Sequence, residues 1–308
     1  MLFLFYFRPV FRSLISWKAL GSLLEAFGTL WVIVKILDFF NLFQGVATWL
    51  KDAWWYFLGA GVVVSVVRTW PRFSARASVA GQDVRVTVTI GDIFRTKAHL
   101  VIGTNTTFDT EVRSQLIARA SVQGQFTQRY FADWKALDAQ VEEQLRDRTS
   151  EELTGAREGK SKRYSIGETV KVYPEPGRAA YLVAMADLNA KGNASGTLEK
   201  LREALGSLWA FIREQGDHGK IAIPLLGTGK TRLPTPRRDI IIEIVRSFLA
   251  ACSEATFCKE LIVVVHPTDA AEYGIRMDDF QSFLKHECRY RPARGKAGGV
   301  SSSGIGVD

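Results

Sequence analysis

The sequence has few of the residues that commonly hold a metal ion or a redox centre. It contains three cysteines and four histidines among 308 residues. Cys252, Cys258 and Cys288 show no CxxC spacing, and an odd number of cysteines cannot pair off completely within one chain. The histidines are far apart and form no HExxH motif. We therefore expect reduced thiols, no metal site and no resident cofactor.

Long runs of one charge are also absent. The formal net charge is +8 and the pI is about 9.4, but the basic residues are scattered and none forms a run of five or six. A nucleic-acid-binding protein commonly gathers its basic residues into one patch. We expect no nucleic-acid partner, because a phosphate-bearing small ligand or an anionic lipid surface explains the charge equally well.

The sequence divides into two regions of different composition. Residues 1–70 are rich in Phe, Leu, Val and Trp and contain little charge, whereas residues 73–290 alternate apolar and charged segments. This split predicts a membrane hairpin over residues 1–72 and a soluble domain over residues 73–290. The Gly- and Ser-rich residues 291–308 predict a disordered tail.

Two apolar segments of the first region predict helices over about residues 20–40 and 46–67. At 1.5 Å per residue, each is long enough to cross most or all of a bilayer core of about 30 Å. Basic residues flank the two segments on both sides, at positions 8, 12 and 18 before them and 68, 72 and 76 after them. Cytoplasmic loops carry such an excess, so we expect a multi-pass protein with both termini in the cytoplasm.

One face of the first predicted helix carries small and ionisable residues. At about 100° per residue, this stripe consists of Gly21, Glu25, Gly28, Val32 and Lys35. A charge at the centre of a spanning helix costs roughly 2.5–3.5 kcal/mol, so such a face is expected to contact protein or water. An interfacial amphipathic helix, with the same face among the lipid headgroups, is the alternative.

Beyond residue 73, strand patterns alternate with helix patterns. Val84, Val86 and Val88 alternate with polar residues, which is typical of a strand with one buried face. Thr235 and Pro236 predict a helix start, with a capping hydroxyl followed by proline in the first position. The alternation predicts a mixed α/β sandwich whose ligands bind at the carboxyl ends of the strands. The predicted strands are 84–90, 99–103, 169–173, 179–186, 220–225 and 261–266, and the predicted helices are 127–147, 197–215, 236–252 and 269–285.

A glycine-rich loop follows the predicted strand at 220–225. Its residues are Leu226, Gly227, Thr228, Gly229, Lys230 and Thr231. Glycines allow backbone amides to approach a pyrophosphate closely and to form an anion-binding concavity. A Walker A loop would need glycine at position 224, where this chain has Pro224, so ATP or GTP hydrolysis is not expected. Lys230 is expected either to neutralise phosphate or to be a solvated loop lysine.

A second loop, Gly91-Asp92-Ile93, ends the alternating strand. A carboxylate at this position can accept a hydrogen bond from an exocyclic amine while the adjacent backbone N–H donates to a ring nitrogen, and together they select adenine. Gly-Asp alone is an ordinary turn dipeptide. Its position ahead of the glycine-rich loop favours the binding interpretation.

Three segments in this order resemble the macro domain: Gly91-Asp92-Ile93, residues 101–105 and residues 226–230. The resemblance covers roughly residues 83–285 and implies a macro-type mixed sheet sandwiched by helices. It implies that Asp92 holds the adenine amine of ADP-ribose, or of an ADP-ribose adduct, and that Ile93 offers its amide. It places Asn105 near the distal ribose and residues 226–231 around the diphosphate.

The residues after Asn105 depart from hydrolytic macro domains, which have a Gly-rich loop there. This chain has Ser121-Val122-Gln123-Gly124-Gln125-Phe126 and then an insertion over about residues 127–165. Ser121, Gln123 and Gln125 could bond the group on the distal ribose, with Gly124 permitting close approach, or they could cap the following helix. We expect no catalytic residues.

The apolar hairpin, the divergent macro domain and the stretch 121–131 together resemble the membrane-bound effectors of bacterial Thoeris antiphage defence. The resemblance implies a protein of the bacterial inner membrane that senses a nucleotide-derived second messenger. A partner TIR-domain enzyme would make this ADP-ribose derivative from NAD, and the effector would form homo-oligomers and damage the lipid bilayer. A membrane-tethered ADP-ribosyl hydrolase and a scaffolding membrane protein are the alternatives.

Overall fold

The computed structural model describes residues 17–40, 54–70, 72–112, 117–154, 159–188, 194–195, 197–227 and 234–290. By its contacts the chain divides into two compact units, residues 1–73 and residues 74–308. The predicted tail, residues 291–308, lies outside the described residues, and so do residues 228–231 of the predicted glycine-rich loop.

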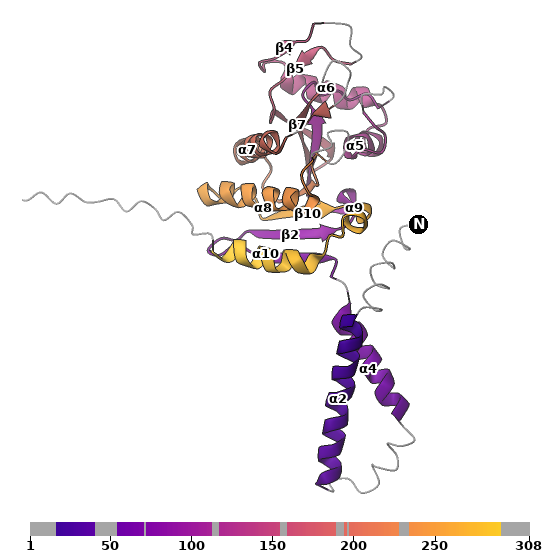
Figure 1. The fold of residues 1–308 in the computed structure, drawn as a ribbon. Coiled ribbons are helices and arrows are strands. Elements are labelled where there is room, and N and C mark those ends of the chain that lie inside the picture. The colour runs from indigo at the N-terminus through magenta and orange to yellow at the C-terminus, as the bar shows by residue number, and fades with distance from the viewer. Residues whose placement is uncertain are drawn as a thin grey trace, which may run out of the picture. The chain divides into compact units, whose positions relative to one another are not determined.

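The first unit contains two helices that contact each other, α2 (Trp17–Phe39) and α4 (Trp54–Thr69) (Figure 1). Arg68 Nη1 of α4 lies 3.4 Å from Glu25 Oε2 of α2. All five residues of the predicted stripe on α2 are exposed. Large apolar side chains of α2 are exposed as well, among them Leu24, Trp31, Ile33 and Ile36.

The structure does not support the predicted transmembrane hairpin. Of the helices in the described ranges, none is both long enough and apolar enough to cross a bilayer. α4 has 16 residues, which at 1.5 Å per residue extend over about 24 Å of a core about 30 Å thick. α2 is longer, with 23 residues, but Glu25 and Lys35 interrupt its apolar sequence.

The second unit is built on one eight-stranded mixed sheet (Figure 1). In spatial order its main strands are β1 (Ser74–Ser78), β2 (Arg85–Ile90), β10 (Glu260–Val265), β9 (Lys220–Pro224), β3 (His99–Asn105), β7 (Arg178–Leu188) and β6 (Thr169–Glu175). The five central strands run parallel, and the edge strands β1 and β6 are antiparallel to their neighbours. The short β8 (Ala194–Ser195) pairs with β7 off this path.

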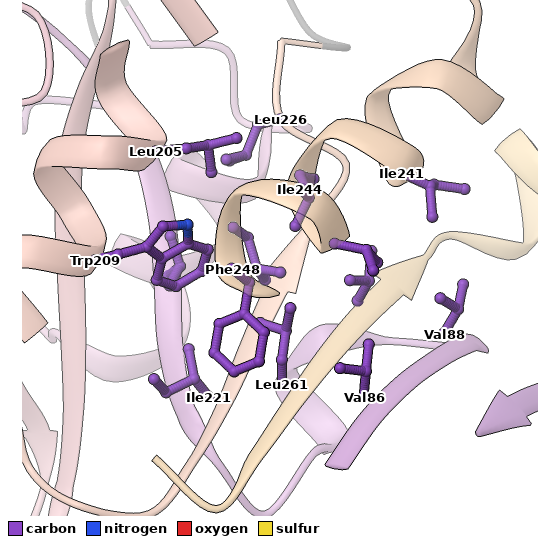
Figure 2. Packing of buried hydrophobic residues seen from close by; sticks show 14 of the residues in the cluster. Val86, Val88, Leu205, Trp209, Ile221, Leu226, Ile241, Ile244, Phe248 and Leu261 are labelled. Atoms are coloured by element: carbon purple, nitrogen blue, oxygen red, sulfur yellow. The ribbon is translucent and has the colours of Figure 1, made fainter. Parts of the chain in front are cut away.

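Three helices cover one face of the sheet, namely α7 (Leu198–Gln215), α8 (Arg237–Glu254) and α10 (Met277–Tyr290). Their apolar side chains form a core with the strands, in which Trp209 of α7 and Phe248 of α8 lie close together (Figure 2). These two rings are 5.4 Å apart, edge to face. Ion pairs join the helices at the surface: Arg202–Glu243 and Arg213–Glu254 between α7 and α8, and Arg246–Glu287 between α8 and α10.

The opposite face of the sheet carries α5 (Val122–Tyr130), α6 (Trp134–Leu145) and the 3-10 helix η1 (Ile93–Arg95). Phe126 of α5 and Leu137 of α6 are fully buried in a second core with strands β3, β6 and β7. The predicted insertion supplies α6 and a small hairpin of two strands, β4 (Glu151–Glu152) and β5 (Lys162–Arg163). A sandwich of helices, sheet and helices results, as the alternation of patterns predicted.

The helix predicted over residues 127–147 is wrong in its extent, because the chain forms two helices there. α5 ends at Tyr130, followed by Phe131 in an extended conformation, and the Asp133 side chain starts α6 by accepting a hydrogen bond from the Lys135 N–H. An aspartate in this position is a common helix start. The apolar pattern continues across the break, and this continuity concealed it in the sequence.

Two further helix predictions differ from the structure. The helix predicted over residues 269–285 is divided into α9 (Pro267–Glu272) and α10, with Gly274 between them at a φ of +61°. Thr235 does not cap α8, contrary to prediction. Pro236 takes the N-cap position, because its ψ of 140° is extended, and its ring has no polar atom that could cap the helix, which begins one residue later than expected.

Candidate functional site

The carboxyl ends of the parallel strands bring the predicted binding loops to one edge of the sheet. β2 ends before Asp92, β9 ends before Gly227, and β3 ends at Asn105. Only β10 separates β2 from β9, so their loops are about two strand spacings, or roughly 10 Å, apart. η1, which follows Asp92, contacts β9. The loops predicted to hold the base and the diphosphate therefore share an edge.

Asp92 caps η1 and is held in one orientation. Its Oδ1 accepts a hydrogen bond of 3.0 Å from the Phe94 N–H. Its Oδ2 lies 3.5 Å from Nη2 of Arg129 in α5 and 4.0 Å from Nε of Arg95. The Asp92 side chain is 26% exposed. One carboxylate oxygen thus bonds the protein backbone, and the other is left to cations and to a ligand.

The backbone N–H of Ile93 directly follows Asp92 in the turn. The side chains of Ile93 and Phe94 are buried in the core beneath α5 and α6, which anchors the turn. Within the described part of the chain, the Ile93 N–H has no hydrogen-bond partner. An acceptor and a free donor therefore lie on consecutive residues, which is the arrangement that adenine requires.

Arg178, at the start of β7, bonds the segment that follows the Asp92 turn. Its guanidinium donates to the carbonyl oxygens of Thr96 and Ala98, each at 2.9 Å, and to the hydroxyl of Tyr130 in α5 at 2.8 Å. Sequence analysis missed Arg178, because Thr96 and Ala98 lie 82 and 80 residues earlier in the chain. No local pattern marks such a contact.

Asn105 lies at the end of β3, as predicted, and its side chain organises the loop that follows. Its Nδ2 donates to Asp109 Oδ2 at 2.8 Å, and its Oδ1 accepts from the Asp109 N–H at 3.1 Å and lies 3.2 Å from the Thr107 hydroxyl oxygen. Phe108 in this loop has a φ of +48°, which is strained for a bulky residue. Among the described residues, one Nδ2 hydrogen of Asn105 has no partner.

Asp109 is a buried acid that sequence analysis also missed. Its Oδ2 accepts a hydrogen bond of 2.6 Å from the Thr107 hydroxyl, and its Oδ1 accepts one of 2.8 Å from the Lys160 N–H. Nζ of Lys160 lies 2.5 Å from Asp138 Oδ1 in α6. The insertion is therefore bonded to the loop after β3. Lys160 is 51 residues from Asp109, so the sequence carries no local signal of this contact.

The polar side chains at the start of α5 bond the protein itself. Ser121 caps the helix: its hydroxyl accepts from the Gly124 N–H at 3.0 Å and donates to the Ala118 carbonyl at 2.6 Å. Gln123 is buried and donates to the Thr104 hydroxyl and the Asp109 carbonyl, at 2.9 and 2.7 Å. Gln125 donates to the Ala120 carbonyl at 2.9 Å. The sequence left two roles open for these side chains, namely binding the group on the distal ribose and capping the following helix. The hydrogen bonds seen here correspond to the second, structural role.

Glycine is required at position 124 by the protein backbone. A Cβ there would lie 2.3 Å from the Ala118 carbonyl oxygen. The first two amides of α5, those of Val122 and Gln123, have no partner among the residues that the structure describes. Free amides at a helix N-terminus carry partial positive charge. The start of α5 therefore offers donors next to the end of β3.

The described part of the glycine-rich loop consists of Leu226 and Gly227. A Cβ at Gly103 of β3 would lie 3.3 Å from the buried Leu226 side chain, so this loop begins close against the sheet. Gly227 has a φ of +74°, a conformation that favours glycine. The other four predicted residues, Thr228, Gly229, Lys230 and Thr231, lie outside the described residues, so their contact with a diphosphate stays a prediction.

Cysteine chemistry is not apparent at this edge of the sheet. The three cysteines are free and buried, and burial raises the pKa of each thiol, to about 12 for Cys252 and about 11 for Cys288. Thiols with a raised pKa are poor nucleophiles. In the ranges that the structure describes, no three His, Cys, Asp or Glu side chains are placed to hold a metal ion.

Comparison with solved structures finds macrodomains of low sequence identity. A point mutant of the Oceanobacillus iheyensis macrodomain with ADPR is 14% identical, with a TM-score of 0.46, and the match covers 69% of this chain and 99% of that one. The Trypanosoma brucei macrodomain in complex with ADP-ribose is 11% identical, with a TM-score of 0.41, over 68% and 71% of the two chains. Likeness at this distance carries no functional argument.

Comparison of sequences is more specific. Thoeris protein ThsA of Bacillus amyloliquefaciens (strain Y2) is 27% identical over 176 residues, which are 56% of this chain and 57% of that protein. The match thus spans little more than half of the relative's length. The family model described as "Thoeris protein ThsA, Macro domain" matches residues 86–266, which include Asp92 and Asn105. Because this match covers more than half of the chain, the protein belongs to the family of Thoeris ThsA macro domains and has the macro-type fold.

Proposed function

We propose that this chain is a sensor and effector of Thoeris antiphage defence whose macro domain binds ADP-ribose or an ADP-ribose adduct. The observation that carries the proposal is the Asp92 carboxylate beside the free Ile93 N–H, on the same sheet edge as Gly227. Acceptor and donor together complement adenine, and a glycine turn leaves backbone amides free for phosphate. Membership of the family and the name of the Bacillus relative support the same function.

The proposed ligand lies along the carboxyl edge of the parallel strands. Asp92 accepts from the adenine amine, Ile93 donates to the ring, and residues 226–231 surround the diphosphate. The distal ribose lies by Asn105 and the start of α5, residues 121–125, where the free amides of α5 and one hydrogen of Asn105 are the donors. A partner TIR-domain enzyme supplies this nucleotide-derived messenger.

Calorimetric titration of the full-length chain with ADP-ribose, NAD and ADP-ribose adducts tests the binding step. Asp92→Asn is the sharpest variant, because its amide oxygen can still accept from the Phe94 N–H and keep η1 capped. The substitution replaces the second carboxylate oxygen with an NH2 group, which donates and cannot accept a hydrogen bond from the adenine amine. We therefore expect the affinity for ADP-ribose to fall at least about tenfold. Asp83→Asn, an exposed aspartate of the same domain, is the matched control and should bind like the wild type.

The titration also separates the alternatives. A hydrolase would give a continuing heat signal as it turns over substrate. It would also release free ADP-ribose from an adduct, and this release would be lost in Asn105→Ala. If none of the nucleotides binds or shifts the melting temperature, the sensor function is rejected, and the scaffolding alternative is left.

The finer part of the proposal is that ligand binding drives self-association and membrane disruption at the bacterial inner membrane, with both termini cytoplasmic. The apolar side chains exposed on α2, such as Trp31 and Ile36, support contact of this unit with lipid. The stripe of Gly21, Glu25, Gly28, Val32 and Lys35 is exposed and is the proposed surface for contact between copies.

Dye-loaded vesicles that contain the full-length chain test this step. We expect release on addition of the ADP-ribose derivative that binds in the titration, and no release with Asp92→Asn. Intact vesicles in the presence of tightly bound ligand would reject membrane disruption but leave ligand sensing in place. Flotation with the vesicles, measured in the same preparation, shows separately whether the chain associates with lipid.

A further inference from the structure

Arg129 of α5 lies at the end of the candidate site where the adenine is proposed to bind. Its Nη2 is 3.5 Å from Asp92 Oδ2, and its guanidinium carbon is 4.8 Å from the centre of the Phe94 ring. Phe94 therefore holds both charged groups, because its ring contacts the guanidinium and its N–H bonds the other oxygen of Asp92. Arg129 remains 49% exposed, so a ligand can reach it.

The position of Arg129 is fixed by the anchoring of α5. Gln123 bonds the start of this helix to β3 and to the loop after it. Phe126 in the middle is fully buried. Tyr130, next to Arg129, accepts a hydrogen bond from Arg178. Arg178 also donates to the carbonyls of Thr96 and Ala98, which follow the Asp92 turn. One rigid helix thus carries Arg129 to the side of Asp92.

The Arg129 guanidinium has more N–H donors than it uses within the described residues. An arginine has five N–H groups, and within the described residues Arg129 directs its only side-chain hydrogen bond at Asp92, at the long distance of 3.5 Å. Exposed pairs of this kind contribute little to stability. A ligand atom that accepts hydrogen bonds can therefore share or replace this contact at low cost.

We propose that Arg129 is a specificity-determining residue that donates a hydrogen bond to N7 of the ligand's adenine. This inference rests on the proposed function. Along its edge adenine presents an acceptor at N1, a donor at the N6 amine and an acceptor at N7. The protein presents the complementary set, with the Ile93 N–H as a donor, Asp92 Oδ2 as an acceptor and the Arg129 guanidinium as a second donor. Since Ile93 serves N1, N7 is the acceptor left beside the amine.

A simpler role for Arg129 would be to neutralise Asp92. The two roles differ in what they require of the ligand, because charge neutralisation is indifferent to N7, whereas a hydrogen bond to N7 is lost when that atom is replaced by carbon. The 7-deaza analogue of ADP-ribose makes this single replacement and keeps the N1 and N6 groups. It therefore separates the two roles without any change in the protein.

The experiment is a calorimetric titration of the full-length chain with ADP-ribose and with 7-deaza-ADP-ribose. We expect the wild type to bind the analogue at least about tenfold more weakly, the usual effect of losing one hydrogen bond to a charged group. Arg129→Met should bind ADP-ribose more weakly than the wild type and should bind both compounds equally. Arg95→Met is the matched control: it removes the other arginine near Asp92, which is 79% exposed, and should keep the preference of the wild type.

The outcomes are distinct. Equal binding of both compounds by the wild type would overturn this inference and leave the proposed function standing. A preference that survives unchanged in a folded Arg129→Met variant, as judged by its melting curve, would also overturn it. If neither compound binds the wild type, the proposed function fails, and this inference fails with it.

Discussion

At the scale of the single residue, His99 is the group from which we expect stability to depend on pH. It lies at the start of β3, and its Nδ1 accepts a hydrogen bond of 3.0 Å from the Ala179 N–H. Burial lowers the pKa of His99 below its ordinary value of 6.5, and Arg178 and Lys171 lower it further, while Asp217 opposes them. A proton on Nδ1 would remove the acceptor that Ala179 needs.

We expect the domain to lose stability as the pH falls below about 6.5. The unfolded chain takes up a proton on this histidine near pH 6.5, whereas folded His99 takes it up only at lower pH, so protonation favours unfolding. The contribution of neutral His99 to stability is complete above pH 6.5 and is lost as the pH falls toward the pKa of His99 in the folded state. Melting temperatures between pH 8 and pH 5 measure this, with limits about one and a half units on either side of the ordinary value.

His99→Gln is the control for this prediction, because its amide oxygen can accept from the Ala179 N–H and does not titrate. Its melting temperature should fall less steeply with acid than that of the wild type, because the two proteins differ only at position 99. Parallel curves for the two proteins would show that His99 is not the responsible group.

At the scale of the element, glutamine side chains from helices close both edges of the sheet. Gln281 of α10 accepts from the N–H of Arg76 in β1 at 3.2 Å and donates to its carbonyl at 2.9 Å. On the other edge, Gln144 of α6 accepts from the N–H of Lys171 in β6 at 2.8 Å and donates to its carbonyl. Open edges invite pairing with another chain, and these side chains take the place of a neighbouring strand.

Replacing Gln144 with leucine should uncover the β6 edge. We expect the Lys171 amide to exchange its hydrogen roughly fivefold faster, since a lost hydrogen bond is worth about 1 kcal/mol, and we expect the chain to aggregate more readily. Hydrogen exchange resolved to single residues measures the first effect. Lys135→Leu places the same apolar side chain on the exposed surface of α6 and should leave Lys171 protected. If Lys171 exchanges equally in both variants, the glutamine does not protect this edge.

At the scale of the whole molecule, the second unit contains a complete core of its own. Both apolar clusters, one on each face of the sheet, are formed by residues between Ala75 and Cys288. We therefore expect a fragment of residues 74–290 to fold without the first unit and to unfold in one cooperative calorimetric transition. A broad, non-cooperative melt of this fragment, under conditions where the full chain melts sharply, would contradict that expectation.

Much of this architecture could be predicted from local patterns. The alternation of Val84, Val86 and Val88 predicted β2, and the apolar run before Asn105 predicted β3, because burial on a sheet face imposes a period of two residues. Helix boundaries were less predictable. The break near Phe131 and the uncapped start at Pro236 depend on how the chain turns against its neighbours, and propensity alone does not reveal that.

By itself, the sequence determined the order along the chain of six strands, β2, β3, β6, β7, β9 and β10, the position of Asp92 at the end of a strand, and Gly227 in a turn that needs a positive φ. These are local properties, since they follow from spacing, side-chain type and the absence of a Cβ. Only the tertiary structure decided what surrounds Asp92 and Asn105. Arg129 is 37 residues from Asp92, and Lys160 is 51 residues from Asp109, so folding alone makes them neighbours. Hydrogen bonds depend on position in space, and position in space is set by the packing of the entire sheet.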